Sequence, residues 1–410
     1  MKPTVAIVGG GPAGLSAAAE LAPHCSGEVL VIERESEAGG IPRHSDHLGY
    51  GIRDRKSFMT GPKYAKKLLR EAQAAGARIW TQAQVTGWAE TGALQVTSRD
   101  GLFEVDAEAV LLATGARERP RAARMVWGDR PEGVYTTGQL QNAVHVHHQT
   151  IGKEAIVVGA ELVSWSAVLT LKEAGCATRA LISEHPRAES YALFNHLGKA
   201  FFRTKVVQNS RVIAIKGKHR VEAVEIEDAI TKERQHLACD TVVFTGNWVP
   251  DYELAWSAGL EIDHASGAPV VDNSMQTSKP GVFAAGNLNH PVETADVVSL
   301  EGQFVAERIL EYLTTASGSG PSVRLTTEGS LKWVSPSRYA PTGPAPAREK
   351  LVCWVDKLTM VPTIEVHQAG IRLARIRSPW PASPGRAFRI PSSVLKHVRS
   401  DMGDVTISVS

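Results

Sequence analysis

The amino-acid sequence predicts an α/β protein with two βαβ-containing domains and a smaller β domain at its C-terminal end. Residues 4–22 and 152–183 each contain a buried-type strand, a glycine-containing turn and a helix, and another apolar strand completes each unit. Residues 323–410 instead alternate apolar and polar residues in short runs separated by prolines, which is typical of small β structure. We therefore expect two Rossmann-like domains and one appended β domain.

The expected domain boundaries follow from this pattern and from the chain length of 410 residues, which suffices for two or three domains. We expect the first Rossmann-like domain to be discontinuous, comprising residues 1–117 and 240–315, with the second inserted at residues 118–239. Residues 316–322 are small, polar and rich in glycine, and they predict a linker to the β domain at 323–410.

Composition excludes several classes of protein. Hydrophobic residues make up 43% and charged residues 21% of the chain, and the formal net charge of +2 favours neither nucleic acid nor a membrane surface as a partner. No apolar run reaches the roughly 18 residues of a membrane span, and the N-terminus lacks the basic region of a signal peptide. The cysteines show no CxxC or Cys/His spacing, so we expect a cytoplasmic protein without a metal site; they are Cys25, Cys176, Cys239 and Cys353.

The first glycine-rich turn, "GGGPAG", has the GxGxxG spacing of a dinucleotide-binding turn. Gly9 permits the tight turn, Gly11 lets the backbone approach a pyrophosphate, and Gly14 allows the following helix to pack against the strand. The helix N-terminus adds partial positive charge. Glu33 ends the next strand, where a carboxylate accepts hydrogen bonds from ribose hydroxyls. Together these residues predict a bound dinucleotide in the first domain.

Two later segments, "LLATGARERP" at 111–120 and "TSKPGVFAAGN" at 277–287, resemble elements of the pyridine nucleotide-disulfide oxidoreductases. This resemblance covers about residues 1–315, and it implies that the first domain binds FAD and that the second is NAD-like. The second segment usually ends in Asp in that family, whereas Asn287 stands here and can both donate and accept hydrogen bonds. By resemblance the FAD-binding residues are Gly9, Gly11, Pro12, Ala13, Gly14, Glu33, Arg34, Gly40, Arg43, Val85, Ala113, Thr114, Gly115, Gly286, Asn287 and Asp296.

Residues 38–68 and 115–144 carry a tighter resemblance. They are similar to flavoprotein subunits of dye-linked proline and hydroxyproline dehydrogenases, opine oxidases and hydrogen cyanide synthase, and to FAD oxidoreductases associated with anaerobic glycerol-3-phosphate dehydrogenases. The resemblance implies oxidation of a small amine, amino acid or alcohol within a hetero-oligomer. It does not identify the substrate.

The second turn, "GAELVS" at 159–164, departs from the dinucleotide-binding pattern. Only Gly159 matches, and Glu161 occupies the second glycine position, where its side chain would take the space of the pyrophosphate and repel it by about 1 kcal/mol at 4 Å in water. We therefore do not expect NAD(P) to bind in the usual pose. Glu184 nevertheless follows Gly159 by 25 residues, where a ribose-binding acid belongs. An adenine nucleotide in an altered pose and an empty site both remain open.

Candidates for proton transfer lie in the segment "GGIPRHSDH". His44 and His47 have side chains that titrate near neutrality and are candidate catalytic residues, although hydrogen bonding to loop backbone is the alternative role. Arg43 is a candidate for binding either the FAD pyrophosphate or a substrate carboxylate. The segment "AVHVHH" at 143–148 is interpreted as a polar connection rather than a metal site, because neighbouring histidines point in different directions.

The leading functional hypothesis is an FAD-dependent dehydrogenase, or its FAD subunit, that passes electrons to a partner protein or another non-nicotinamide acceptor. We expect an oligomer with a second subunit or an electron-acceptor protein, and no nucleic acid. Disulfide reduction is not expected, since the sequence supplies no cysteine pair beside the flavin motifs. The two alternatives are an NAD(P)H-dependent FAD reductase and a noncatalytic or electron-relay FAD subunit of a larger complex.

Overall fold

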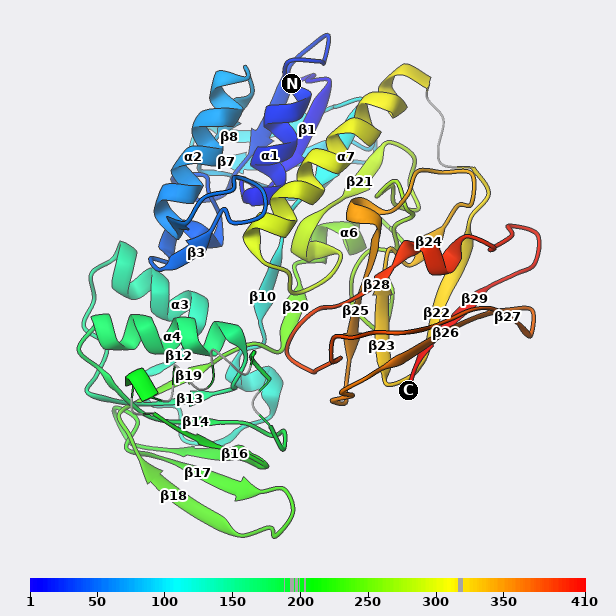
Figure 1. The fold of residues 1–410 in the computed structure, drawn as a ribbon. Coiled ribbons are helices and arrows are strands. Elements are labelled where there is room, and N and C mark those ends of the chain that lie inside the picture. Colours follow the sequence, from blue (N-terminus) through cyan, green and yellow to red (C-terminus); the bar gives the residue numbers. More distant parts are fainter. Residues whose placement is uncertain (188, 192–194, 196–197, 199, 203, 316–319) are drawn as a thin grey trace. The chain divides into compact units, whose positions relative to one another are not determined.

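The computed structural model describes all residues except 188, 192–194, 196–197, 199, 203 and 316–319, so most of the expected linker at 316–322 lies outside the described residues. The chain forms two compact units (Figure 1). Unit 1 comprises residues 1–43, 48–116 and 250–410, and unit 2 comprises residues 44–47 and 117–249. Between the units the chain passes through two strands that pair with each other, β10 (Ala116–Glu118) and β20 (Trp248–Pro250).

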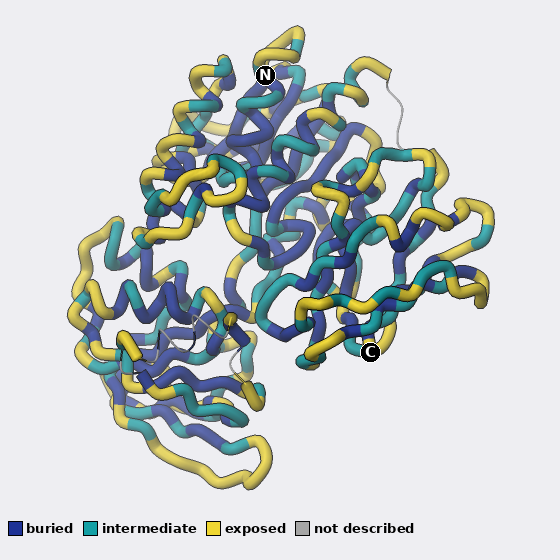
Figure 2. Tube along the Cα trace, in the orientation of Figure 1, coloured by how far each residue is buried: buried dark blue, intermediate teal, exposed yellow. Residues whose placement is uncertain are grey.

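A parallel five-stranded sheet forms the centre of unit 1, in the order β21-β9-β1-β2-β5. The strands β1, β2 and β9 are buried along their whole length (Figure 2), which agrees with their uninterrupted apolar sequences. Their order, with β1 between later strands on both sides, is that of a doubly wound sheet. The bounds are β1 (Val5–Val8), β2 (Val29–Ile32), β5 (Arg78–Trp80), β9 (Ala109–Leu112) and β21 (Val282–Ala284).

Helices α1 and α7 pack closely against each other in unit 1 (Figure 1). A Cβ atom at Gly302 would lie 2.2 Å from the carbonyl oxygen of Ala13, so only glycine permits this approach. The helices of unit 1 are α1 (Pro12–Leu21), α2 (Gly61–Ala74), α6 (Glu253–Ser257), α7 (Ala295–Thr315) and the short turns η1 (Ile41–His44) and η4 (Gly286–Leu288). Small antiparallel sheets complete it, formed by β3 (Leu48–Tyr50) with β4 (Met59–Thr60), and by β6 (Ala83–Trp88), β7 (Leu94–Ser98) and β8 (Gly101–Val105).

The C-terminal β structure belongs to unit 1 and has its own apolar core. Its sheets have the orders β24-β22-β29-β26-β27 and β23-β25-β28. Asn273 attaches it to the preceding segment, since its Nδ2 donates to the Ala340 carbonyl at 3.1 Å and its Oδ1 accepts from the Ala340 N–H at 2.8 Å. The elements are β22 (Val323–Gly329), β23 (Leu331–Ser335), β24 (Arg338–Tyr339), η5 (Ala347–Glu349), β25 (Lys350–Val355), β26 (Thr363–Gln368), β27 (Ile371–Arg377), β28 (Phe388–Pro391), η6 (Ser392–Leu395) and β29 (Val405–Val409).

Unit 2 contains the second parallel sheet, in the order β12-β19-β13-β14-β15. An antiparallel layer of β16, β17 and β18, joined at its edge by β11, shares a second apolar core with this sheet. The elements are η2 (Arg121–Arg124), β11 (Trp127–Gly128), β12 (Val134–Thr136), α3 (Thr137–Gln141), the π-helix η3 (Asn142–Val146), β13 (Glu154–Val158), α4 (Leu162–Glu173), β14 (Ala177–Ile182), β15 (Lys205–Val207), β16 (Ser210–Lys216), β17 (Ala223–Asp228), β18 (Arg234–Ala238) and β19 (Thr241–Phe244).

The predicted fold class is therefore confirmed: two Rossmann-like α/β units with additional small β sheets. In each unit the glycine turn lies between a strand of the parallel sheet and the helix that follows it, β1 and α1 in unit 1 and β13 and α4 in unit 2, at the carboxyl end of that strand. Among the residues that the structure describes, none of the helices has both the length and the apolar character needed to cross a bilayer.

Candidate functional site

The Gly9–Gly14 turn joins β1 to α1 in unit 1. Gly9 has φ +107°, and a Cβ atom there would lie 2.4 Å from the Ala113 carbonyl oxygen, while a Cβ at Gly14 would lie 2.0 Å from the Gly9 carbonyl oxygen. Both glycines are thus required by the protein's own packing. Gly11 differs, because nothing lies within 4 Å of the position of its Cβ. The turn leaves open space at the N-terminus of α1, where a phosphate is attracted by free N–H groups and the helix dipole.

The carboxylate of Glu33, which is 7% exposed, organises this turn. Its Oε2 accepts a hydrogen bond from the Gly10 N–H at 2.8 Å, and its Oε1 accepts one from the Glu35 N–H at 2.9 Å. Each carboxylate oxygen can accept a further hydrogen bond, which is the capacity a ribose hydroxyl requires. Arg34 is largely exposed, and its Nη1 lies 3.7 Å from a carboxylate oxygen of Asp251.

Several other predicted cofactor residues converge on the same sheet edge. Gly115 follows β9 with open space around its Cβ position, and the Thr114 hydroxyl donates to the Asp251 carbonyl at 2.8 Å. A Cβ at Gly40 would lie 2.9 Å from the Gly11 Cα, so the two loops meet. Pro12 and Ala13 lie in the first turn of α1, Arg43 lies in η1 and Ala113 follows β9. Val85 lies on β6, a strand of the separate antiparallel sheet β6-β7-β8.

Asn287 connects η4 with the segment that leads to α7. Its Nδ2 donates to the Glu293 carbonyl at 3.2 Å, and its Oδ1 accepts from the Glu293 N–H at 2.8 Å. An aspartate could not donate the first of these bonds, which gives a structural reason for an amide at this position. One N–H and one lone pair of Asn287 remain for a ligand, so its role toward FAD stays a prediction.

The first turn of α7 carries Asp296, whose side chain is 2% exposed. Asp296 accepts hydrogen bonds from the backbone N–H of Arg53 at 3.0 Å and from the Arg53 guanidinium at 3.1 Å. Burial pushes the pKa of Asp296 upward, but the hydrogen bond from Thr294 and the charge of Arg53 together hold that pKa below its ordinary value. Asp296 is therefore an ionised and paired residue.

Sequence reasoning missed two further buried acids of this segment. Glu301 accepts from the Gly286 N–H at 2.6 Å and contacts the Nε2 of buried His290 at 2.5 Å. Burial alone would lower the pKa of His290, but the charge of Glu301 and its hydrogen bond raise it. Glu293, whose side chain is 1% exposed, forms a two-point ion pair with Arg389 of β28. No periodic pattern signals these contacts, since partners such as Glu293 and Arg389 are far apart in the sequence.

In unit 2 the corresponding turn is filled by its own side chains. Gly159 has φ +126°, and a Cβ there would lie 2.2 Å from the Thr245 hydroxyl. The Ser164 hydroxyl contacts the same Thr245 hydroxyl at 2.6 Å and accepts from the Glu161 N–H at 3.0 Å. The Glu161 carboxylate lies directly against Gly246, where a Cβ atom would come within 2.2 Å of its Oε1. Glu161 is the N-cap of α4, so its carboxylate lies beside the helix end that would bind a pyrophosphate.

The electrostatics of Glu161 reflect this enclosure. Burial and the negative charge of Glu189 raise the pKa of Glu161 to about 8, against the opposing effects of the Arg124 charge and a hydrogen bond from the Asn247 backbone. Arg124 is fixed beside it, donating to the carbonyl oxygens of Thr245 at 3.0 Å and Gly246 at 2.7 Å. The predicted acid Glu184 is exposed, two residues beyond β14.

The candidate histidines His44 and His47 belong to unit 2 through their contacts. The Nδ1 of His145 in η3 donates to the His44 carbonyl at 2.5 Å, and the Nε2 of His145 lies 2.9 Å from Glu173. His47 contacts the Ser45 hydroxyl through its Nε2 at 3.0 Å. The contacts of His44 and His47 thus lie within unit 2, to which residues 44–47 belong. The role of the two histidines in proton transfer stays a prediction.

All four cysteines are free thiols. Burial raises the pKa of each: that of Cys176 to about 11, that of Cys239 to about 12, and those of Cys25 and Cys353 to higher than their ordinary values. A raised pKa keeps a thiol protonated and a poor nucleophile near neutral pH.

The fold and the glycine turn of unit 1 define a class, the FAD-dependent oxidoreductases with two dinucleotide-binding-type domains. Within that class, the chain belongs to the pyridine nucleotide-disulphide oxidoreductase family, whose model matches residues 3–319. This confirms the family suggested by the sequence motifs.

Individual relatives are distant. The chain is 26% identical over 359 residues to an opine oxidase subunit of Rhizobium meliloti, covering 78% of this chain and 65% of that protein. It is 24% identical over 404 residues to an opine oxidase subunit of Agrobacterium tumefaciens (strain Ach5), covering 86% and 76%. Thioredoxin reductase of Treponema pallidum (strain Nichols) is 26% identical over 319 residues, covering 76% and 97%. The match with the Rhizobium meliloti protein thus spans slightly less than two thirds of that relative's length.

Solved structures agree on the fold. Thioredoxin reductase of T. acidophilum superimposes with a TM-score of 0.64 at 21% identity, over 77% of this chain and 99% of that chain. L-proline dehydrogenase from P. horikoshii superimposes with a TM-score of 0.58 at 22% identity, over 77% of this chain and 56% of that chain. At such identities the similarity concerns the fold alone.

Proposed function

We propose that this flavoprotein is a dehydrogenase, or the FAD subunit of one, which oxidises a small amine, amino acid or alcohol and passes the electrons to a partner protein or another non-nicotinamide acceptor. The observation that carries the proposal is the Glu161 carboxyl group, which lies at the N-terminus of α4 against Gly246. The place where a nicotinamide dinucleotide would bring its pyrophosphate is taken by an acid of the protein itself.

The residues of unit 1 fit FAD. The open space at Gly11 and the N-terminus of α1 suit a pyrophosphate, and Glu33 retains hydrogen-bonding capacity for ribose hydroxyls. Gly115 leaves further space at the same sheet edge. Bound FAD supplies a two-electron acceptor for the substrate's hydride. The contribution of the protein is to bind and orient the reactants and to move a proton, for which His44 and His47 remain the candidates.

The substrate class and the partner rest on relatives. Two relatives are named as subunits of opine oxidases, which means that those proteins are parts of larger assemblies. A structure with the same fold is a proline dehydrogenase. We infer by analogy that this chain also oxidises a small C–N or C–O compound and acts together with a second subunit.

Anaerobic reduction of the flavin tests the donor. The purified flavoprotein would be mixed with secondary amines, amino acids and small alcohols, and separately with NADH and NADPH, while the flavin absorbance is followed. We expect bleaching by a member of the first set and negligible reduction by micromolar NADH or NADPH. Rapid reduction by either nicotinamide would favour the NAD(P)H-dependent reductase instead. Bleaching only after addition of a partner protein would favour the electron-relay role.

Substitution of Glu161 tests the closed second site. Because a pKa of about 8 leaves most of Glu161 protonated at pH 7, Glu161→Gly removes mainly the bulk beside Gly246. We expect it to raise the affinity for NADH several-fold as measured by calorimetry. Glu161→Gln keeps the bulk and serves as the matched control for occupancy of the site. If both variants bind NADH as weakly as the parent protein, the Glu161 side chain is not the obstacle.

The same titration with ADP addresses the alternative of an adenine nucleotide in an altered pose. Exposed Glu184 lies two residues beyond β14, where it remains available for a ribose hydroxyl. We expect Glu184→Gln to weaken any ADP binding several-fold. Absence of ADP binding by the parent protein would favour an empty second site.

A further inference from the structure

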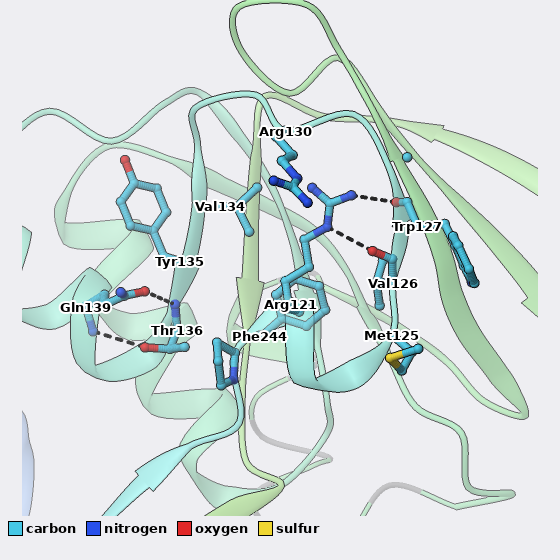
Figure 3. A pocket seen from close by; sticks show the side chains of 13 residues that line it. Arg121, Met125, Val126, Trp127, Arg130, Val134, Tyr135, Thr136, Gln139 and Phe244 are labelled. Carbon is cyan, nitrogen blue, oxygen red and sulfur yellow. Dashed lines mark hydrogen bonds between the residues drawn. The ribbon is translucent and has the colours of Figure 1, made fainter.

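A second concave site lies in unit 2, away from the Gly159 turn. The pocket has a volume of about 660 Å³ and follows β12, the edge strand of the parallel sheet (Figure 3). Neither Gly159 nor Glu161 contributes to its wall. Its size suits a small organic molecule. Its lining residues come from η2, β11, β12, the start of α3 and the end of β19.

The wall of this pocket is mainly apolar. Ala122, Val126 and Val134 line it, and the Phe244 ring, which is 0% exposed, lies beneath this wall. Two large apolar side chains at the pocket, Met125 and Trp127, are 71% and 72% exposed. Leaving such surfaces in water is unfavourable, and burying them provides binding free energy in proportion to the apolar area covered. The ligand should therefore carry an apolar body.

The polar part of the lining is cationic. Arg121 and Arg130 both line the pocket, whereas no Asp or Glu is among its lining residues in the part of the chain that the structure describes. Figure 3 shows the two guanidinium groups near each other, and the charge of Arg130, after burial, is a cause of the lowered pKa of Arg121. The nearby Asp129, whose charge acts on Arg121, accepts a hydrogen bond from the Gly217 N–H at 3.0 Å and is not among the lining residues. The two like charges in the pocket wall therefore favour an anion between or near them.

The two arginines have different roles. Arg121 binds the backbone of its own loop, because its guanidinium donates to the carbonyl oxygens of Val126 at 3.1 Å, of Trp127 at 2.5 Å and of Asp129. These bonds fix the segment that carries Met125 and Trp127. Arg130 is exposed and forms no hydrogen bond or ion pair with any residue that the structure describes. Its planar fork can bind a carboxylate with two parallel hydrogen bonds.

A further donor lies across the pocket. Gln139 joins Thr136 in the capping box of α3, where the Gln139 Oε1 accepts from the Thr136 N–H at 3.0 Å. That bond orients the Gln139 side chain while its Nε2 still has donor capacity. The pocket thus contains the charged guanidinium of Arg130, the neutral hydrogen-bond donor Gln139 and an apolar wall.

We propose that this pocket binds an organic monocarboxylate with an aromatic or branched apolar body, through a two-point contact with Arg130 and burial against Val126, Val134 and Trp127. The carboxylate takes the fork of Arg130, and the apolar body covers the exposed faces of Met125 and Trp127. Unit 2 then has a ligand site separate from its altered dinucleotide turn.

Calorimetric titration of the full-length flavoprotein tests this site with three probes: 3-phenylpropionate, its uncharged amide and inorganic phosphate. We expect one phenylpropionate to bind per chain. The amide should bind at least about tenfold more weakly, because it cannot form the ionic contact with Arg130, and a tenfold change in affinity corresponds to about 1.4 kcal/mol. Equal affinity for acid and amide would overturn the proposal. It would also fail if phosphate competed with comparable affinity, or if phenylpropionate did not bind at millimolar concentration.

Variants locate the ligand. Arg130→Gln removes an exposed side chain without a partner among the described residues, so the fold should persist while phenylpropionate affinity falls about tenfold or more. Ala122→Phe fills the pocket and should reduce the affinity similarly. Lys218→Gln, an exposed cation outside the lining, is the matched control and should not change binding. Unchanged affinity in both pocket variants would place the ligand elsewhere.

Fluorescence gives an independent reading of position. A ligand that covers the exposed Trp127 should shift the fluorescence emission of that side chain. The parent protein should therefore show a ligand-dependent change in emission that the Trp127→Phe variant lacks. The flavin absorbance should stay unchanged throughout the titration. A ligand-induced change that persists in Trp127→Phe, or one confined to the flavin spectrum, would contradict this location.

Discussion

Gly11 and Gly14 belong to one motif but have different roles, one in leaving space for the cofactor and one in packing the helix, and substitutions should distinguish these roles. A side chain at Gly11 meets no protein atom within 4 Å, so Gly11→Val should fold normally and lose FAD, because the valine fills the space of the pyrophosphate. A methyl group at Gly14 would lie 2.0 Å from the Gly9 carbonyl oxygen, so Gly14→Ala should lose stability as well as flavin. The flavin-to-protein absorbance ratio and the thermal unfolding curve measure both effects. A Gly11→Val protein with full flavin content would overturn the cofactor assignment.

Glu161 should make the stability of unit 2 depend on pH. Its pKa is raised to about 8 by burial and by Glu189, whereas the unfolded chain titrates near the ordinary value of about 4.3, so the native state binds more protons between these values. The contribution of Glu161 to stability is therefore greatest below about pH 4.3, and it decreases as the pH rises toward 8. The expected loss is on the order of a few kcal/mol.

Glu161→Gln should flatten this dependence and stabilise the protein at pH 8. Urea unfolding at pH 5 and pH 8, followed by circular dichroism, measures the free energy of unfolding. Substitution of exposed Glu184 by Gln is the matched control, and its profile should follow that of the parent protein. Parallel profiles for the Glu161 and Glu184 variants would show that the Glu161 carboxyl does not control the pH dependence.

At the scale of elements, the Glu293–Arg389 pair ties the start of α7 to β28 of the C-terminal sheets. Arg389→Ala would leave a carboxylate that is 1% exposed without its counterion, and we expect a loss on the order of 3 kcal/mol in the free energy of unfolding. The exposed pair of Arg399 and Asp401 provides the control, since Arg399→Ala should leave the free energy of unfolding nearly unchanged. Similar costs for the two variants would mean that water replaces Arg389.

The sequence predicted the elements better than their contacts. The buried strands, the turn at Gly9 and the altered turn at Glu161 follow from local patterns, because periodicity and glycine spacing are properties of neighbouring residues. The ion pair of Glu293 with Arg389 and the attachment of His44 to His145 join segments distant in the sequence. Such contacts depend on how elements pack, which no local pattern records. The candidate flavin turn was therefore predictable, whereas the surroundings of α7 and of the histidines were not.

For the molecule as a whole, the family name raises the question of thiol chemistry. One relative is named a thioredoxin reductase. This chain has four free cysteines, of which Cys25 and Cys353 lie in unit 1 and Cys176 and Cys239 in unit 2. A pair of thiols can exchange electrons only if their sulfur atoms meet and one is a thiolate. Burial instead raises the pKa of every thiol, to about 11 for Cys176 and about 12 for Cys239.

Electron transfer through this protein should consequently not depend on its thiols. Treatment of the native flavoprotein with N-ethylmaleimide at pH 7 should proceed slowly, and the rates of flavin reduction by substrate and reoxidation by a dye should stay within about twofold of the untreated protein, since protonated thiols are poor nucleophiles. A variant with all four cysteines replaced by alanine controls for incomplete alkylation, and its flavin content identifies any loss that comes from folding. If turnover falls in step with alkylation of one thiol while flavin content is retained, a cysteine takes part in the redox path, and the acceptor must be sought among disulfides rather than among partner proteins or dyes.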